Sequence, residues 1–388
     1  MFEILTLNAI SNKIFTVFDD NYSVSSDTKN PDAILVRSFK MDDYEIGDNL
    51  LAIGRAGAGV NNIPIPRMTE KGIAVFNTPG ANANAVKELV ICGLLLSARD
   101  IIGGSKWADT LDGDVAKAVE KGKKAFGGFE IAGKTLGIIG LGAIGKLVAG
   151  AAEALSMKVA GYDPFLSEVA AKGLSEKGII IKNTPEEIYE IADYITLHVP
   201  LTQDTREMIN ADSINLMKDG AVVLNMARGE LVNVSAVKEA LATGKLRKYV
   251  VDFPNADCIN TPGIIAIPHL GASTEEAEDN CAVMAATELK DYLENGNVTN
   301  SVNFPRLSKD REYDERITVV CNAAQSVPQD LEAILADYKY SMKYAEKGSV
   351  GYAIIDISGD LCNGDSALMD RLSDLDNVIS IKIGRAHV

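Results

Sequence analysis

Short apolar runs alternate with longer amphipathic stretches along most of the chain. Between residues 33 and 98, three apolar runs, "AILVRS", "LLAIGRAG" and "GIAVFNTPG", precede a stretch of helical period that begins near Asn82, "NANAVKELVICGLLLSARD". Alternation of this kind predicts βα units and a largely parallel sheet. A polar stretch over residues 103–134 then interrupts the pattern.

The same alternation resumes after residue 134. Five apolar runs follow, and each ends in a turn that carries polar residues: "KVAGYDP", "IADYITLHVP", "AVVLNMARG", "YVVDFP" and "IIAIPH". An open α/β sheet binds its ligands at the carboxyl ends of its strands. We therefore expect the chemistry of the protein to lie in these turns.

The C-terminal part of the chain has a different pattern. Residues 274–296 predict one long helix with a glycine stop, and residues 297–315 read as a linker. From residue 316 the predicted order is strand, helix, strand, strand, helix, strand, which is typical of a ferredoxin-like module. The expected fold class is α/β, with two doubly wound parallel-sheet domains and a C-terminal α+β module.

Composition and charge exclude several classes of protein. The net charge of −16 argues against a general binder of nucleic acid or anionic membranes, because such proteins usually need a basic surface. The longest apolar runs are too short to span a membrane, and the start "MFEILTLNAI" lacks a secretory signal, which predicts a cytoplasmic protein. Five scattered cysteines without C-x-x-C spacing favour free thiols and indicate no metal site.

A glycine cluster, "GIIGLGAIGKLVAG", stands between a predicted strand and a predicted helix. In a dinucleotide-binding turn, Gly140 makes the tight turn, Gly142 lets a pyrophosphate approach the backbone, and Gly145 lets helix and strand pack closely. The helix start, with the amides of Ala143 and Ile144, then faces the phosphates.

An acidic residue supports the same interpretation. Asp163 ends the next predicted strand, eighteen residues after Gly145. A carboxylate there accepts hydrogen bonds from the ribose hydroxyls and repels the extra phosphate of NADP. We therefore expect the cofactor to be NAD.

The chain has only three histidines, so the search for an acid/base is short. His387 lies among the last residues and is expected to be exposed, and His198 follows a strand and is expected to order a loop beside the cofactor. His269 ends the run "IIAIPH" beside a glycine turn. Because imidazole titrates near neutral pH, His269 is the predicted acid/base.

A catalytic histidine is commonly oriented by a carboxylate, and Asp252 and Asp257 in "VVDFPNADC" are the candidates. Arg228 follows a buried-looking strand in "NMARGELVN". Its guanidinium can hold a substrate carboxylate with two parallel hydrogen bonds, which a lysine cannot do.

The motifs "GLGAIG", "YDP", "HVPLT", "NMARGELVN", "VVDFP" and "PHLGAST", in this order, resemble those of the D-isomer-specific 2-hydroxyacid dehydrogenases over about residues 33–300. The resemblance places the catalytic Arg at Arg228, the His at His269 and the aspartate near the nicotinamide at Asp252. Asp257 stands where the usual partner of the His is Glu, one methylene longer. The resemblance also implies cofactor contacts from Pro200, Thr205, Ala227 and Gly271.

The implied organisation is a flavodoxin-like substrate-binding domain (1–98 and 276–300) with an inserted Rossmann-type NAD-binding domain (99–275). A linker (301–315) and a module (316–388) follow. The motifs "GRAGAGVNNI", "NTPGANANAVKE", "GGSKWAD" and "PHLGASTEEAEDN" narrow the resemblance to the branch that oxidises 3-phospho-D-glycerate to 3-phosphohydroxypyruvate at the entry to serine synthesis.

The substrate residues implied by this resemblance begin with Arg55, which is expected to hold the phosphate, and the amides of Ala58 and Gly59, which are expected to hold the carboxylate. Asn77 is a further expected contact. Lys87 replaces the small residue that usually precedes the helix Glu, and we hypothesise that it helps to bind substrate. Weaker candidates for the phosphate are Arg67 and Lys71.

The C-terminal module resembles a regulatory ACT domain, but its loop "CNAAQSVPQDL" has no histidine and has Gln329 in place of the usual glycine. Binding of serine and a role in oligomerisation both remain open, and we expect a homo-oligomer, either a dimer or a tetramer. Two alternative functions also remain open: a hydroxypyruvate or glyoxylate reductase, and an NAD-sensing scaffold without turnover.

Overall fold

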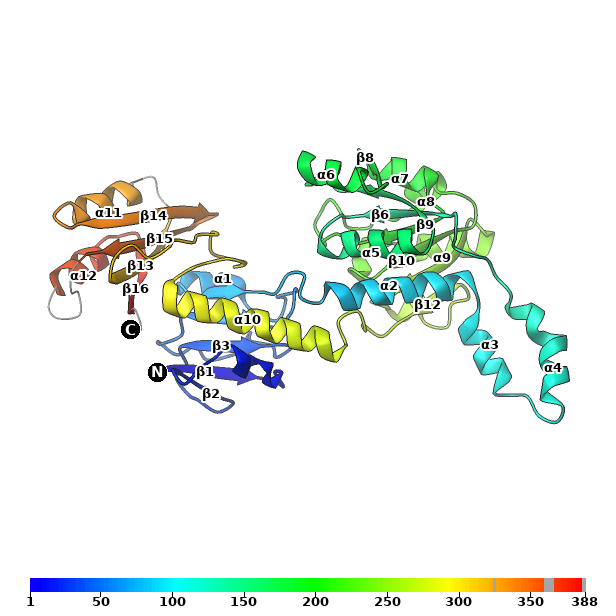
Figure 1. Ribbon diagram of the computed structural model, residues 1–388, viewed down its shortest axis with the longest axis horizontal. Coiled ribbons are helices and arrows are strands. Elements are labelled where there is room, and N and C mark those ends of the chain that lie inside the picture. Colours follow the sequence, from blue (N-terminus) through cyan, green and yellow to red (C-terminus); the bar gives the residue numbers. More distant parts are fainter. Residues whose placement is uncertain (324–325, 359–365, 386–388) are drawn as a thin grey trace. The chain divides into compact units, whose positions relative to one another are not determined.

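The computed structural model describes residues 1–323, 326–358 and 366–385, so His387, Cys362 and part of the loop over 321–331 lie outside the described residues. The chain divides into two compact units (Figure 1). Unit 1 comprises residues 1–81 and 278–388, and unit 2 comprises residues 82–277.

Unit 1 is built on a sheet of five parallel strands in the order β2-β1-β3-β4-β5. This is the strand order of the flavodoxin-like fold. The strands are β1 (Phe2–Leu7), β2 (Tyr22–Ser25), β3 (Ala33–Val36), β4 (Ala52–Arg55) and β5 (Ala74–Phe76). The helices of this part are α1 (Ile65–Glu70) and the long α10 (Glu275–Asn295), which agrees with the helix predicted over 274–296.

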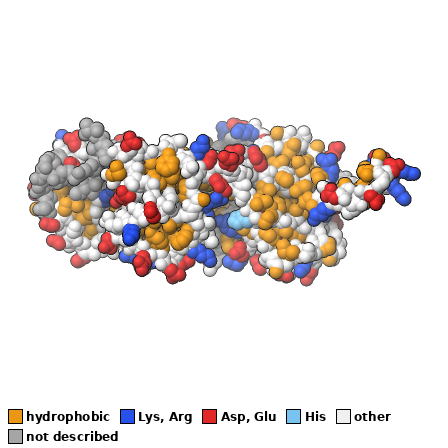
Figure 2. All heavy atoms as spheres, turned by 90° about the horizontal axis from the view of Figure 1, so that it is seen from below, with side chains coloured by type: hydrophobic (Ala, Val, Ile, Leu, Met, Phe, Trp, Pro, Cys, Tyr) orange, Lys and Arg blue, Asp and Glu red, His pale blue; other side chains and the backbone are white. Residues whose placement is uncertain are grey.

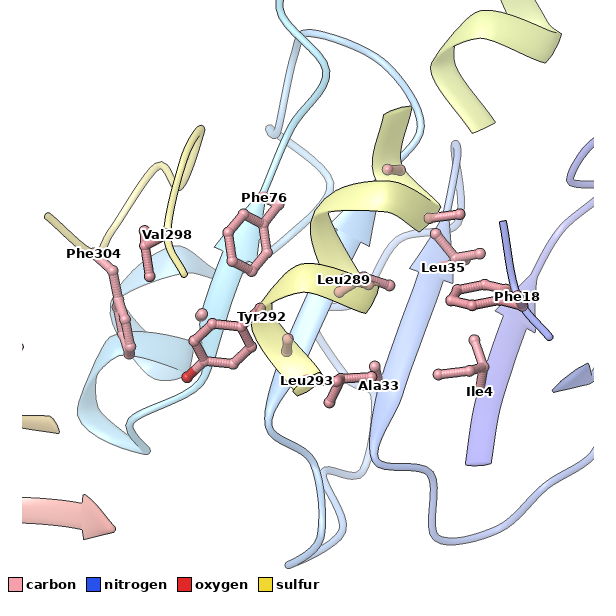
Figure 3. Close-up of a cluster of buried hydrophobic side chains, with 14 of the residues drawn as sticks. Ile4, Phe18, Ala33, Leu35, Phe76, Leu289, Tyr292, Leu293, Val298 and Phe304 are labelled. Atoms are coloured by element: carbon pink, nitrogen blue, oxygen red, sulfur yellow. The ribbon is translucent and has the colours of Figure 1, made fainter. Parts of the chain in front are cut away.

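The core of unit 1 forms where α10 lies across the sheet. Leu289 and Leu293 project from α10 toward Leu35 and Ala33 of β3 (Figure 3). The contact with β4 is so close that a Cβ on Gly54 would come within 3.0 Å of the Leu289 side chain. The apolar face of α10 therefore fixes this helix on the five-stranded sheet of unit 1.

Unit 2 is built on a sheet of seven strands in the order β12-β11-β10-β9-β6-β7-β8, all parallel. Its strands are β6 (Thr135–Ile139), β7 (Lys158–Tyr162), β8 (Ile180–Lys182), β9 (Tyr194–Leu197), β10 (Ala221–Asn225), β11 (Leu246–Val251) and β12 (Ile264–Ala266). Helices connect them: α5 (Ala143–Ala154), α6 (Glu168–Ser175), α7 (Pro185–Ile191), α8 (Ala211–Leu216) and α9 (Val234–Thr243). The order reverses between β6 and β9, as in the predicted Rossmann-type domain.

Helix α2 (Ala83–Ala98) belongs to unit 2 by its contacts, whereas we assigned residues 82–98 to the first domain. Its buried residues Val90 and Leu94 share a hydrophobic core with Leu224 of β10 and Val250 of β11. At Gly93 an added Cβ would lie 3.2 Å from these two side chains. The chain therefore changes units before this helix, because the apolar face of α2 packs on the second sheet.

The predicted polar stretch after residue 98 contains two further helices, α3 (Ile101–Ala108) and α4 (Val115–Gly122), which protrude as an arm from unit 2 (Figure 1). Every residue of both helices is described, and none is buried. Apolar and charged side chains lie together on the surface of this arm (Figure 2). We expected only a polar stretch here, although Val115, Ala118 and Val119 of α4 follow the helical spacing i, i+3, i+4.

The C-terminal module in unit 1 is an antiparallel sheet in the order β14-β15-β13-β16, as expected for a ferredoxin-like fold. Its elements are β13 (Glu315–Asn322), α11 (Val327–Leu335), β14 (Tyr340–Lys347), β15 (Val350–Ile357), α12 (Ser366–Ser373) and β16 (Val378–Arg385). One face of the sheet packs under the two helices through Ile317, Val319 and Ile355. The other face, with Tyr352 and Ile354, joins the core of α10.

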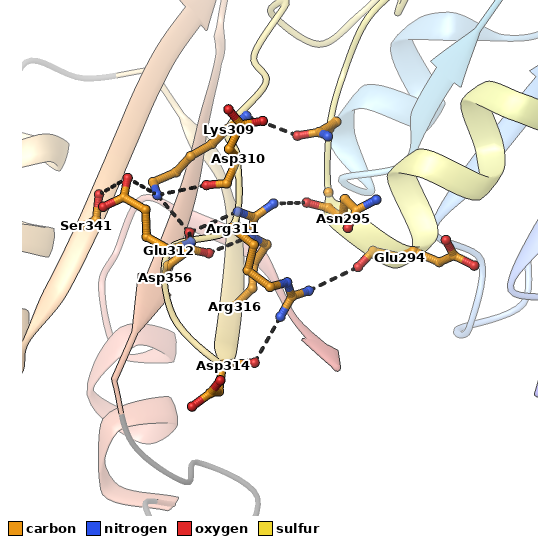
Figure 4. A network of polar contacts seen from close by, with 12 residues as sticks. Glu294, Asn295, Lys309, Asp310, Arg311, Glu312, Asp314, Arg316, Ser341 and Asp356 are labelled. Atoms are coloured by element: carbon orange, nitrogen blue, oxygen red, sulfur yellow. Dashed lines mark hydrogen bonds and ion pairs between the residues drawn. The ribbon is translucent and has the colours of Figure 1, made fainter. Parts of the chain in front are cut away.

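A buried ion network also attaches the module (Figure 4). Asp356 is fully buried and accepts hydrogen bonds from Arg316 (Nε to Oδ1, 2.6 Å) and Lys309 (Nζ to Oδ2, 2.7 Å). Arg316 also donates to the Asn295 carbonyl at the end of α10 (2.9 Å), and Lys382 of β16 donates to the Leu293 carbonyl (2.6 Å). Cations at this end satisfy open carbonyls and oppose the negative end of the helix dipole.

Within the described ranges, no helix is both long enough and apolar enough to cross a bilayer. The cysteines in these ranges, Cys92, Cys258, Cys281 and Cys321, are free thiols, and all except Cys92 are buried.

Candidate active site

Each of the three glycines in the turn after β6 is required for a different structural reason. Gly140 has φ of 96°, and a Cβ there would lie 2.5 Å from the His198 carbonyl oxygen. A Cβ on Gly145 would lie 2.0 Å from the Gly140 carbonyl oxygen, so only glycine lets α5 start this close to the strand. A Cβ on Gly142 would meet no atom within 4 Å, which leaves the backbone at the start of α5 open to a ligand. This bare backbone at a helix N-terminus fits the pyrophosphate of a dinucleotide.

The side chain of Asp163 lies at the same turn. One carboxylate oxygen accepts the amide of Leu141 (2.9 Å), and the other accepts the amide of Phe165 (2.9 Å). The acid is thus fixed between the glycine turn and the end of β7. Both oxygens keep a further lone pair for a ligand hydroxyl.

His198 follows β9 and supports the glycine turn rather than titrating. Its backbone amide donates to the Ile139 carbonyl (2.7 Å), and its Nε2 lies 3.0 Å from the Thr196 hydroxyl. Burial lowers the pKa of His198 to about 4. The imidazole is therefore neutral at physiological pH and suited to ordering the loop. The other predicted residues here, Pro200 and Thr205, bond to each other in the following turn, hydroxyl to carbonyl, at 2.7 Å.

Arg228 and His269 come from the ends of β10 and β12 and contact the same aromatic ring. The guanidinium carbon of Arg228 lies 5.4 Å from the centre of the Phe253 ring, and the His269 ring centre lies 4.3 Å from it. Both catalytic candidates are exposed, so their polar groups are free to meet a substrate. Residues 41 positions apart in the sequence are thus brought to one place by the parallel order of the strands.

The backbone at His269 is held in an unusual conformation. Its φ of 55° lies in the left-handed region, which costs a residue with a side chain about 1–2 kcal/mol. The buried Asp252 accepts the amides of Leu270 (2.7 Å) and Gly271 (2.8 Å), and its carbonyl accepts the His269 amide (2.9 Å). Burial raises the pKa of Asp252, and these amides oppose that shift. Asp252 therefore orients His269 through the backbone.

Asp257, the other candidate partner of His269, lies in the turn after β11 and pairs with a different residue. Its carboxylate is largely exposed and pairs with Lys238 of α9 at 3.6 Å. No hydrogen bond joins Asp257 to His269 within the part of the chain that the structure describes. The structure thus brings Arg228 and His269 together and leaves Asp257 with a different partner.

The predicted substrate residues of unit 1 form a second cluster at the ends of β4 and β5. The guanidinium of Arg55 lies over Gly57, whose φ of 144° and missing side chain make room for it. The Asn77 side chain donates to the Ala58 carbonyl (2.6 Å), and the amide of Thr78 donates to the Gly57 carbonyl (3.1 Å). The turn that contains Ala58 and Gly59 is thereby tied to the end of β5.

Two of the remaining cationic candidates, Lys87 and Arg67, have partners within the chain. The ammonium of Lys87, near the start of α2, donates to the Asn84 side chain (2.7 Å) and pairs with Glu88 (3.5 Å). Arg67 on α1 donates to the Asp42 carbonyl (3.1 Å), and Lys71 follows the end of α1.

Sequence reasoning missed two residues that build the site of unit 2. Asn225 is fully buried and holds the Arg228 turn, because it donates to the Arg228 carbonyl (2.7 Å) and accepts the Ala227 amide (3.1 Å). The ring of Phe253 contacts both catalytic candidates, Arg228 and His269. Their positions in the sequence could have indicated both residues, because each lies next to a predicted strand end and within three positions of a predicted site residue.

Known proteins share these features. Residues 94–271 match the model of the NAD-binding domain of the D-isomer specific 2-hydroxyacid dehydrogenases. The D-3-phosphoglycerate dehydrogenase 2 of Saccharomyces cerevisiae is 32% identical over 360 residues, which cover 86% of this chain and 74% of that protein. The chain belongs to the D-isomer-specific 2-hydroxyacid dehydrogenase family.

Other members of the family are also similar. The D-3-phosphoglycerate dehydrogenase of Methanocaldococcus jannaschii is 38% identical over 73% of this chain, which spans about half (54%) of that relative's length. The structure of an NAD+-bound 3-phosphoglycerate dehydrogenase from Entamoeba histolytica aligns with a TM-score of 0.61 and 27% identity over 79% of this chain and 99% of that one. Unit 2 contains the family's binding domain, and the dinucleotide that this domain binds is NAD.

Proposed function

We propose that this family member oxidises 3-phospho-D-glycerate to 3-phosphohydroxypyruvate with NAD. The observation that carries the proposal is the convergence of Arg228 and His269 on the ring of Phe253, in the unit that has the dinucleotide turn. Arginine and histidine supply what this reaction needs: a fixed cation for an α-hydroxy carboxylate and a group that exchanges a proton near neutral pH. The names of the relatives support the choice of substrate.

The residues divide the chemistry between them. His269 takes the proton of the substrate hydroxyl, and Asp252 keeps the imidazole in place through the backbone. Arg228 binds the carboxylate and polarises the carbonyl oxygen that forms. NAD, when bound, accepts the hydride from the substrate carbon that carries this hydroxyl. The open backbone at Gly142 and the Asp163 carboxylate hold its pyrophosphate and ribose.

The phosphate distinguishes this substrate from other 2-hydroxy acids. We assign it to Arg55, whose guanidinium lies at the end of β4, and we expect the amides of Ala58 and Gly59 in the following turn to bind the substrate carboxylate. A guanidinium suits a phosphate dianion because it offers two parallel donors. Lys87 remains a candidate for a supporting contact, as do Arg67 and Lys71.

The test is a substrate panel followed by NADH absorbance: 3-phosphoglycerate, 3-phosphohydroxypyruvate, hydroxypyruvate, pyruvate and glyoxylate, each with NAD(H) and NADP(H). We expect turnover with the phosphorylated pair and NAD(H). Preference for glyoxylate or hydroxypyruvate would replace the proposed substrate, and no turnover with any acid would favour a scaffold. R55A should raise KM for phosphoglycerate, whereas K29A, at an exposed lysine of unit 1, should not. An unchanged KM in R55A would remove the phosphate assignment.

A homo-oligomer is part of the proposal. The arm of α3 and α4 exposes Ile101, Ile102 and Val115, all of them more than 40% accessible, although isolated short helices are only marginally stable in water. A second copy that covers these side chains would explain why the arm is helical. Light scattering should give at least a dimer, and the I101D/V115D double variant should give a smaller species. A location in the cytoplasm stays a prediction of the sequence.

A further inference from the structure

Unit 1 buries an acidic side chain that the proposed chemistry does not use. Glu288 on α10 is only 8% exposed. Its Oε1 accepts a hydrogen bond from the Asn300 side-chain amide at 2.5 Å. Its Oε2 is buried and has no hydrogen-bond partner among the described residues. Burying a carboxyl group with one unpaired oxygen costs stability, so an apolar side chain would serve better here if packing were the only role.

The partner of Glu288 leads to the predicted substrate loop. The carbonyl of Asn300 accepts the backbone amide of Asn77 at 3.4 Å. Asn77 in turn donates from its side chain to the Ala58 carbonyl at 2.6 Å. Three consecutive hydrogen bonds therefore connect the carboxyl group to the backbone that we assign to the substrate carboxylate.

The segment around Asn300 needs such an anchor. It follows α10 and lies against the edge of β5, where Phe76 pairs with Ser301 and the amide of Val302 donates to Val75 (2.8 Å). It has no regular secondary structure of its own. The neighbour of Glu288 in the sequence, Leu289, packs against Gly54 of β4, so α10 presents Glu288 from a fixed position on the sheet.

We propose that Glu288 is a positioning residue for substrate binding, which acts through Asn300 and Asn77 to hold the Gly57–Gly59 backbone ready for the substrate. This inference rests on the proposed function. Glu288 does not touch the substrate, Arg228 or His269 in this role. Its loss should therefore weaken substrate binding and leave the rate at saturation and the affinity for NAD almost unchanged.

The experiment compares four single variants and one double variant with wild type in steady-state kinetics. E288L removes the acceptor, and E288Q keeps an acceptor oxygen with nearly the same shape. N300A removes the same bond from the other side. The matched control is E294L, because Glu294 also lies on α10 and accepts a side-chain hydrogen bond, from Tyr22 at 2.8 Å, but is not connected to the substrate loop.

We expect E288L and N300A each to raise KM for phosphoglycerate about 5- to 30-fold, with kcat within twofold of wild type. E288Q should restore KM to within about threefold, and E294L should leave KM unchanged. The double variant E288L/N300A should not exceed the larger single effect, because both changes break one bond. If E288L fails to fold, N300A and E288Q decide the question.

Three results would overturn the inference: an unchanged KM in both E288L and N300A, a fall of kcat with KM unchanged, or an equal rise of KM in E294L. Failure of the proposed function is recognised separately in the wild-type protein. If another acid of the panel is the substrate, the same KM comparison is made with that acid. If no acid turns over, the dissociation constant of 3-phosphoglycerate, measured by calorimetry with NAD present, replaces KM, and unchanged binding in E288L and N300A overturns the inference.

Discussion

Phe253 offers a sharp test of how the site of unit 2 is assembled, because one ring contacts both catalytic candidates. The variant F253A removes a tilted ring contact with His269 at 4.3 Å and a cation–π contact with Arg228 at 5.4 Å. Such ring pairs contribute about 0.5–1.5 kcal/mol, and exposed cation–π contacts about 0.5–1 kcal/mol. Their joint loss corresponds to about a 5- to 70-fold fall in kcat/KM.

The assay is NADH formation with 3-phosphoglycerate at saturating NAD. F253L keeps much of the apolar volume without the π face, so its activity should lie between wild type and F253A. KM for NAD should change little, because the glycine turn is untouched. A folded F253A, with its melting temperature within a few degrees of wild type and kcat/KM within twofold, would refute the role of the ring in aligning Arg228 and His269.

Three further predictions concern packing and charge. G145A should weaken NAD binding about tenfold or more, because its Cβ would lie 2.0 Å from the Gly140 carbonyl oxygen. The control is G150A on the same helix, whose Cβ would meet no atom within 4 Å. In thermal melts, G150A should stabilise the protein by about 0.5–1 kcal/mol. R316L should lower the free energy of unfolding by about 3–5 kcal/mol, because Asp356 stays buried without its main partner. E120Q, at the exposed pair with Lys123, should change the free energy of unfolding by less than about 1 kcal/mol. Equal losses for the two variants in urea titrations would contradict the prediction. Burial raises the pKa of Glu288 from 4.5 to about 7, so between these pH values the folded protein holds a proton that the unfolded chain has released, and stability should fall as pH rises through this window and level off above it. E288Q should lack this fall, and identical stability–pH curves for the two proteins would argue against a titrating Glu288.

Local patterns were sufficient for much of the fold and for the nucleotide turn. The strands of both parallel sheets are short apolar runs that end in turns, and the helix over Glu275–Asn295 has a glycine directly after its expected end. Gly140, Gly142 and Gly145 were assigned their roles from spacing alone, because a tight turn and a close approach impose glycine at particular positions of a short segment. Arg228 and His269 could be selected because parallel strands place their carboxyl ends at one edge.

Features that depend on packing between distant segments were not predictable in this way. The sequence pattern of α2 does not show which sheet this helix covers, since nothing within its own sequence indicates that Gly93 approaches β10 and β11. The pairing of Asp257 with Lys238 depends on how separate turns fold over each other, and so does the contact of Phe253 with both Arg228 and His269.

The architecture could be inferred from the sequence alone, and so could the candidates for the dinucleotide turn, the cation and the imidazole, because these follow from periodicity and from short-range steric demands. Only the packing of distant segments shows which sheet each helix covers, that Arg228 and His269 both contact the ring of Phe253, and that Glu288 lies buried beside Asn300. The physical reason is that burial and side-chain partners are set by contacts between residues far apart in the chain, and an acidic residue within a helical pattern has the same local signal whether solvent or a protein interior surrounds it.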